Sequence, residues 1–286
     1  MGIILALWAA FFETIKDAIQ KHNVKDIDPY LLGWLYRTLS LIFIAPCLYF
    51  IEIPQVWGNF FIILVISWIL NSCATLLYLQ ALKHWDISNT VPLVALTPCF
   101  MLITSPIMIG EKVNSIWFIG VVLWAIWAYM LAYEKWDQNF FAPFKSLIRN
   151  KGSRYMLIVA CIYSITSNID KMGIQQSSAL FWLFSLNAIL CCFLFIIMIF
   201  VWKRDYRKLL KSWPTVLLSW GIGTVALVFQ VKAVAIEMVT YVISVKRMSV
   251  IFSVLIWYFV FHEKNIKARF IGSIFLISGV VFITLT

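Results

Sequence analysis

The chain has 286 residues, of which 63% are hydrophobic and 13% charged, and its formal net charge is +10. This composition excludes an ordinary soluble domain. The backbone N–H and C=O groups of such apolar segments must form their hydrogen bonds without water, in helices or a closed barrel. The basic residues are scattered over short loops rather than gathered on one face, so the charge does not predict nucleic-acid binding.

The apolar runs are long enough to cross a membrane as helices, which predicts an all-α integral membrane protein. Ten spans are predicted, at about 2–20, 30–52, 59–82, 88–109, 115–133, 155–172, 178–201, 214–235, 238–261 and 268–286. Tryptophans fall at the ends of several runs, where we expect interfacial anchors: Trp57, Trp85, Trp117, Trp136 and Trp213. The first run lacks a basic leader, so we expect it to remain in the mature protein.

All six cysteines lie inside apolar runs and show no metal-ligand spacing with histidine. We therefore expect free, buried thiols, with no metal site and no cofactor.

The two halves of the chain repeat each other. An offset of 152 places Glu111-Lys112 on Glu263-Lys264 and Phe118-Ile119-Gly120 on Phe270-Ile271-Gly272, and an offset of 150 places Lys21 on Lys171. Each copy would hold five spans, an odd number, so the second copy must enter the membrane from the opposite side. The sequence predicts an inverted repeat with copies at 1–135 and 154–286, joined by a connection at 136–153.

Ten spans in two copies, with Gly110-Glu111 closing the fourth span and Glu263 at the matching place, resemble the EamA-type drug/metabolite transporter superfamily. Gly120 and Gly272, in the fifth and tenth spans, add to this resemblance. It implies a secondary transporter in the cell membrane that moves a small molecule by alternating access.

A narrower resemblance concerns Lys246 and Arg247. The segment from Val245 to Ile251 is similar to the Lys-Arg segment in the ninth span of sugar-phosphate and triose-phosphate translocators, where the two cations bind phosphate. Those translocators have a further lysine in span four, which Thr90 to Pro106 lacks, so the resemblance implies an anion without identifying it as phosphate.

Lys246 and Arg247 also stand out by position, because a cation near the middle of an apolar span is costly unless something repays it. On a helix, Lys246 aligns with Ser249, and Arg247 aligns with Ser244 and Thr240. The two cations suit a carboxylate or phosphate ligand, or else each pairs with a carboxylate and holds helices together.

Span four of the first copy carries three prolines, Pro92, Pro98 and Pro106, and threonines that include Thr97. Prolines remove backbone hydrogen bonds, so we expect either a kinked, threonine-lined cavity wall or kinks that serve helix packing. Thr97 is a candidate substrate contact.

Span one carries Glu13, Lys16 and Asp17 on one helical face. Glu13 and Asp17 are candidates for proton coupling, with a local ion pair or a solvated helix end as alternatives. Asp170 and Lys171 in the second copy have the same alternatives.

Four further residues are candidate substrate contacts: Arg37, Tyr78, Trp220 and Gln230. Arg37 lies well inside span two, opposite Asn187 of the second copy, and the other three could equally form interhelical contacts.

The sequence thus predicts a transporter for a small polar or anionic metabolite, acting as a monomer or homodimer among membrane lipids, and not an enzyme. The alternatives are an intramembrane enzyme for lipid or polyprenyl head groups and a proton-coupled exporter of amphipathic or cationic compounds. Lys and Arg gather at odd-numbered loops, which puts both termini outside, whereas the family expectation puts them in the cytoplasm.

Overall fold

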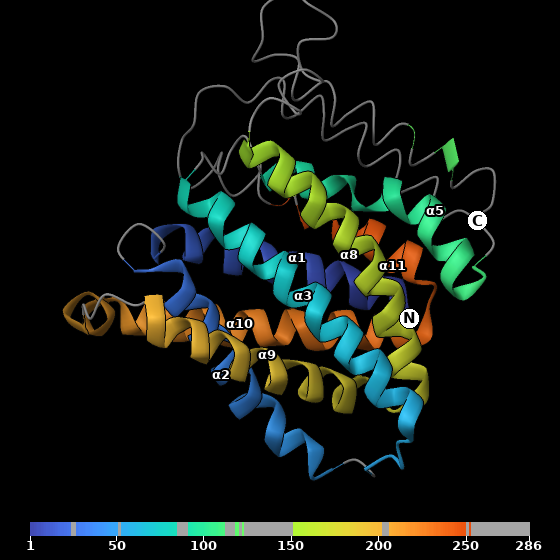
Figure 1. Cartoon of the computed structure of the whole chain (residues 1–286), viewed down its shortest axis with the longest axis horizontal. Coiled ribbons are helices and arrows are strands. Elements are labelled where there is room, and N and C mark those ends of the chain that lie inside the picture. Colours follow the sequence, from blue (N-terminus) through green and yellow to red (C-terminus); the bar gives the residue numbers. More distant parts are fainter. Residues whose placement is uncertain are drawn as a thin grey trace, which may run out of the picture. The chain divides into compact units, whose positions relative to one another are not determined.

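The computed structural model describes residues 1–23, 27–50, 53–84, 91–111, 118, 119, 122, 151–201, 206–249 and 252. Within them the chain is all-helical and contains no strand. The first copy supplies α1 (Gly2–Asn23), α2 (Pro29–Leu48), α3 (Gly58–His84), the 3₁₀ helix η1 (Val91–Leu96) and α5 (Thr97–Ile109). The second supplies α8 (Lys151–Gln176), α9 (Ala179–Val201), α10 (Tyr206–Ile236) and α11 (Val239–Lys246) (Figure 1).

Most of these bounds lie close to the predicted spans, and local signals explain several of them. The exception is α11, which ends at Lys246, whereas the predicted ninth span continues to 261. The Asp28 carboxylate accepts the Tyr30 N–H at 2.9 Å and caps α2, whose first residue is Pro29. Gly110 ends α5 in the left-handed conformation, with φ of 67°. Helix α10 begins at Tyr206 rather than at residue 214, so it extends beyond the apolar span into the polar segment before Pro214.

Five helices of the described residues are long and apolar enough to cross a membrane. They contain the segments Tyr30–Leu48, Gly58–Tyr78, Lys151–Gln176, Ala179–Phe200 and Ser212–Ile236. Most of the predicted fifth span, most of the ninth span after Ser249, the whole tenth span, the connection at 136–150 and the Glu263 motif lie outside the described residues. The prediction of ten helices is therefore confirmed only in part: the described residues are all-helical and include several membrane-capable helices.

The chain divides into two compact units. The first unit contains Met1–Ser72 and Ile169–Glu237, and the second contains Cys73–Asn168 and Met238–Thr286. Each unit combines segments from both sequence copies, and α3 and α8 contribute residues to both units. The packing division thus differs in kind from the sequence repeat, whose boundaries stay a prediction.

In the first unit, α1 packs against α10 and α2 packs against α9, while α10 also contacts α2 and α9 (Figure 1). Aromatic rings join the first pair, because Phe12 of α1 stacks on Phe229 of α10 with ring centroids 5.8 Å apart. The core of this unit is a buried cluster of residues: Ile27, Leu31, Leu32, Met198, Val216 and Trp220.

In the second unit, α5 packs against α11. Its core is a buried cluster made of Ala81, Leu93, Val94, Met156 and Val159. Polar groups join α5 to α8, because the Ser105 hydroxyl donates to Asn168 Oδ1 at 2.8 Å and the Asn168 amide donates to Thr104 Oγ1 at 3.1 Å. Thr104 thus takes part in the polar contact between α5 and α8.

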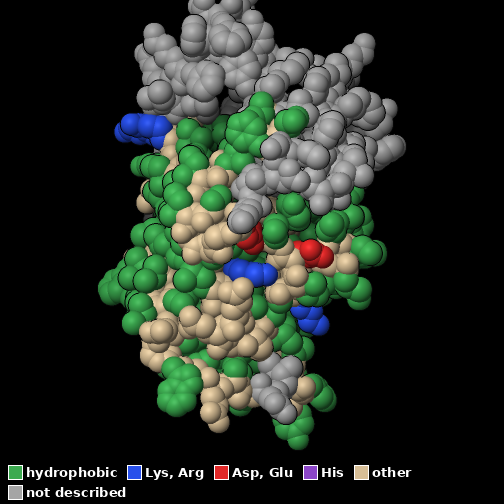
Figure 2. All heavy atoms as spheres, turned by 90° about the vertical axis from the view of Figure 1, so that its right-hand side faces the viewer, with side chains coloured by type: hydrophobic (Ala, Val, Ile, Leu, Met, Phe, Trp, Pro, Cys, Tyr) green, Lys and Arg blue, Asp and Glu red, His purple; other side chains and the backbone are tan. Residues whose placement is uncertain are grey.

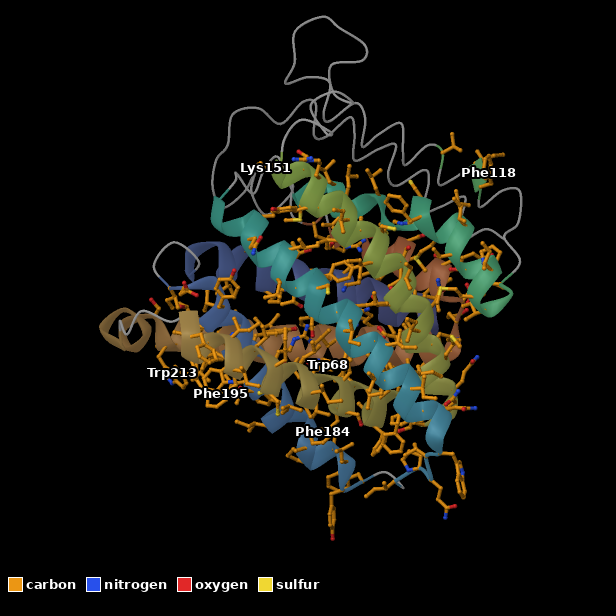
Figure 3. All side chains as sticks on the ribbon, viewed as in Figure 1. Trp68, Phe118, Lys151, Phe184, Phe195 and Trp213 are labelled. Carbon is orange, nitrogen blue, oxygen red and sulfur yellow. The ribbon has the colours of Figure 1, made fainter. Side chains whose placement is uncertain are left out.

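The surface of the described helices is largely apolar, and Figure 2 shows one face on which hydrophobic side chains predominate and charged ones are few. Phe195 on α9 and Trp213 on α10 are among the exposed aromatic residues (Figure 3). The expectation of buried thiols is wrong for Cys47, Cys73 and Cys192, which are free but exposed. A membrane span can carry apolar thiols on its outer surface, because lipid rather than water covers that surface.

Candidate functional site

The fourth span of the first copy changes helix type at its prolines. The 3₁₀ helix η1 ends at Leu96, and α5 begins at Thr97 with Pro98 in its first turn. Proline fits a first turn, since it lacks the N–H that an interior position would need. The Thr97 side chain is buried, and its hydroxyl donates to the Val94 carbonyl at 2.6 Å. At Pro98 the predicted kink is therefore a transition from 3₁₀ to α helix, whereas Pro106 lies inside α5.

The ninth span also departs from regular α-helical geometry, and it does so at the two predicted cations. Helix α11 ends at Lys246, and Arg247 and Met248 form a turn. The Arg247 N–H reaches the carbonyls of both Ile243 and Ser244, and the Met248 N–H donates to Val245 at 2.9 Å, three residues back. Such 3₁₀ tightening within a span often marks a functional position.

Thr97 and Arg247 meet at these two irregular points. The Arg247 Nη2 donates to Thr97 Oγ1 at 2.9 Å, so the threonine hydroxyl accepts from the guanidinium while it donates to the backbone. The two residues are 150 positions apart, which is the offset that aligns Lys21 with Lys171. At this contact the copies match with the offset of 150, and not with the offset of 152 that places Ala95 on Arg247.

The hydroxyls that share the helical face of Arg247 are used within the protein. The Ser244 hydroxyl donates to the Thr240 carbonyl at 2.7 Å, and the Thr240 hydroxyl donates to Glu111 Oε2 at 3.1 Å. Both residues are buried, whereas Lys246 and Arg247 are partly exposed. Arg247 is therefore the partly exposed polar side chain of this face, and Lys246 lies about 100° around the helix.

Glu111 fixes the start of α11, a role that sequence reasoning missed. Its Oε1 accepts the Val239 N–H at 2.8 Å, and its Oε2 accepts the Thr240 N–H at 3.3 Å. A carboxylate stabilises a helix N-terminus by accepting its unpaired N–H groups and by opposing the positive end of the dipole. The left-handed Gly110 turns the chain directly before Glu111. The Gly110-Glu111 motif was visible in the sequence, but its partner helix was not.

In the first unit, Glu13, Lys16 and Asp17 form an ion-pair cluster on α1. The Lys16 ammonium lies 2.9 Å from Glu13 Oε1 and 3.0 Å from Asp17 Oδ1, and it also lies 5.9 Å from the ring centroid of Tyr36. Gly223 of α10 makes room for this cluster, since a Cβ there would lie 2.7 Å from the Tyr36 ring. Of the alternatives for Glu13, the structure contains the local pair with Lys16.

Arg37 contacts Asn187, the residue that the offset of 150 places opposite it. The Arg37 Nη1 donates to Asn187 Oδ1 at 2.7 Å, and Asn187 is buried. The guanidinium also lies 5.8 Å from the Tyr36 ring centroid. Arg37 thus links α2 to α9.

The remaining candidates lie in different surroundings. Trp220 is fully buried in the core of the first unit, and Gln230 is partly buried on α10. Tyr78 packs, partly buried, against the core of the second unit. Among the predicted site residues, Thr97 and Arg247 are in direct contact, and Lys246 is adjacent to Arg247 in the chain.

No group of three or more His, Cys, Asp or Glu that could hold a metal ion occurs among the described residues.

Comparison with known proteins agrees with this architecture. The family model described as "EamA-like transporter family" matches residues 1–133 and 150–285. A crystal structure titled only "Crystal structure of protein" has a TM-score of 0.75 and 16% sequence identity, and the match covers 99% of this chain and 96% of that one. This likeness concerns the fold alone. No curated protein matches the chain.

Proposed function

The chain belongs to the EamA-like transporter family, and from that premise we propose that it carries a small polar or anionic metabolite across the cell membrane by alternating access. The family makes it a multi-pass membrane transporter, in agreement with its apolar helices. Proteins of this family are generally transporters rather than enzymes. The narrower resemblance to sugar-phosphate translocators stays a prediction.

The observation that carries the proposal is the contact between Arg247 and Thr97. Inverted-repeat transporters bind their solutes where interrupted helices of the two copies meet, because irregular backbone and polar side chains are tolerated where they line a cavity. Here the guanidinium of Arg247 in one copy contacts the hydroxyl of Thr97 in the other. At this contact both the fourth and the ninth span depart from regular α-helical geometry.

The charge of this position supports an anionic or strongly polar solute. Arg247 offers a planar set of donors, and Lys246, beside it, offers a compact charge. A solute carboxylate or phosphate would accept hydrogen bonds from both cations and would compensate the cost of placing them within an apolar span. Thr97, which already orients one guanidinium nitrogen, would hold the Arg247 fork in position for the solute.

A counterflow screen tests the proposal. The purified protein is reconstituted into proteoliposomes that are loaded with unlabelled amino acids, sugar phosphates, nucleotide sugars or organic acids. Uptake of the same compound, labelled and added outside, is then measured. Saturable counterflow of an anionic compound is expected, together with a rise in the melting temperature of the protein in its presence. A compound recovered in altered chemical form would instead support the alternative of an intramembrane enzyme.

The double substitution Lys246→Ala with Arg247→Ala separates binding from folding. We expect it to abolish counterflow while the protein still inserts and elutes as a single species from size-exclusion chromatography. Lys232→Ala is the matched control, because Lys232 is an exposed lysine of α10 in the first unit. Counterflow that survives the double substitution would reject the role of the two cations.

A further inference from the structure

A carboxyl group outside the proposed anion site has surroundings that suit a different ligand. Asp170 lies on α8 in the first unit and is partly buried. Its Oδ1 accepts the Trp182 indole N–H at 3.0 Å and the Ser67 hydroxyl at 3.3 Å. Both donors are neutral, both are buried, and Ser67 lies near the middle of the apolar segment Gly58–Tyr78.

The fold builds this contact through a glycine. Gly173, one turn after Asp170 on α8, packs directly under the Trp182 ring, because a Cβ at this position would lie 2.3 Å from a ring carbon. Phe60 meets the same ring edge-on, with centroids 5.7 Å apart at 84°. The indole is therefore held with its N–H directed at the Asp170 carboxyl.

Few charges surround Asp170. Residues 58–72 of α3 and all of α9, which supply its two donors, contain no Asp, Glu, Lys, Arg or His, and Cys191 and Cys192 are the titratable groups of α9. On α2, the charged group is Arg37, and its Nη1 is bound to Asn187.

Charged groups on α8 and on α1 have partners of their own. On α8 itself, Lys171 donates to the carbonyls of Val234 and Glu237 at 2.5 Å and 2.8 Å. On α1, Lys16 lies between Glu13 and Asp17. Among the described residues, Asp170 has no salt bridge within 4.0 Å.

We infer that Asp170 is a proton-binding site of this transporter, and that the proton is the ligand of the Ser67–Asp170–Trp182 cluster. The inference rests on the proposed function, because such a site gives a transporter a way to couple solute movement to protons. It assigns this role to Asp170 in place of Glu13 and Asp17, which both form an ion pair with Lys16.

The geometry accommodates both protonation states. Oδ1 accepts both neutral donors, so Oδ2 can take up a proton without loss of either hydrogen bond. Binding forms one O–H bond on Oδ2 and converts the carboxylate to a neutral acid, and release returns the proton to water. An apolar span favours the neutral state of a carboxyl group, whereas the two hydrogen-bond donors stabilise the anion. The surroundings therefore favour the neutral acid, and the two contacts favour the carboxylate.

Infrared difference spectroscopy tests the inference with the proton alone as probe. Wild-type protein in proteoliposomes is recorded in acidic and alkaline buffer without any solute. We expect a carboxylic-acid C=O band in the acidic state that shifts in D₂O and is absent from Asp170→Asn. Glu13→Gln and Asp17→Asn are the matched controls and should keep the band. A band that persists in Asp170→Asn, or that is lost in a control, overturns the inference.

A second variant keeps the test decisive if Asp170→Asn does not fold. Trp182→Phe retains the carboxyl but removes its indole donor, so the C=O band should move to higher frequency, as it does when a carbonyl loses a hydrogen bond. An unmoved band assigns the signal to another group and overturns the inference. Because no solute is present, these outcomes do not depend on solute binding by Lys246 and Arg247. Counterflow that survives the double substitution of these two residues would reject the anion site and not the proton site.

Discussion

Thr97 and Arg247 occupy matching positions of the two sequence copies, 150 residues apart, and are joined by a hydrogen bond of 2.9 Å. Arg37 and Asn187 have the same relationship, with the same offset and a distance of 2.7 Å. A residue can contact its own counterpart when the two copies are related by an approximate two-fold axis that passes close to both. Among the described residues, each unit therefore shows a polar contact of the kind that an inverted repeat produces.

Thr97→Val should weaken transport. The substitution keeps the shape of the side chain but removes the acceptor that orients Arg247, and a hydrogen bond to a charged group is worth about 1.5–3 kcal/mol. We expect a fall of roughly tenfold or more in counterflow efficiency, since about 1.4 kcal/mol corresponds to a factor of ten. Thr97→Ser retains the hydroxyl and should stay near wild type. Equal losses in both variants would mean that the methyl group, and not the hydrogen bond, matters.

Glu111→Ala should destabilise α11. The variant leaves the N–H groups of Val239 and Thr240 without their carboxylate acceptor, and loss of a helix cap costs about 0.5–2 kcal/mol. The expected result is a lower melting temperature in detergent. Glu111→Gln keeps one acceptor oxygen without the charge and should lie between the alanine variant and wild type. A melting temperature of Glu111→Ala equal to that of wild type would contradict the capping role.

Gly173→Ala should destabilise the first unit, because its new Cβ would collide with the Trp182 ring at 2.3 Å. Overpacking of this kind costs about 1–3 kcal/mol. Gly221→Ala is the matched control, since a Cβ there would meet only Phe43 at 4.0 Å, and alanine favours a helix over glycine. Thermal unfolding of both variants in the same detergent makes the comparison. If Gly221→Ala loses as much stability as Gly173→Ala, helix backbone effects and not the Trp182 contact explain the loss.

The sequence predicted helices such as α3 and α9 well, because the length and apolar character of a span are local properties of the chain. The structure places α3 at Gly58–His84 against a predicted 59–82, and α9 at Ala179–Val201 against 178–201. Pairs that are close in sequence were also within reach of prediction. The ion pair of Glu13 with Lys16 follows from their spacing of three residues on one helix.

Contacts between distant segments could be found only in the tertiary structure. The sequence marked Thr97 and Arg247 separately as candidates, but an offset of two residues decides which residue faces which, and the two repeat signals disagreed on that offset. Asp170 shows the same limit. Its position near the end of a predicted span left its role open among proton coupling, an ion pair and a solvated helix end.

The sequence by itself determined the class of this protein: an apolar, helical, duplicated membrane chain of the EamA type, since hydropathy and repetition are properties of the linear chain. Only the tertiary structure decided the partners of each polar group, that is Arg247 with Thr97, Glu111 with the start of α11, and Asp170 with Trp182 and Ser67. The physical reason is that a partner stabilises a polar group in an apolar span, and packing across helices decides which partner it meets.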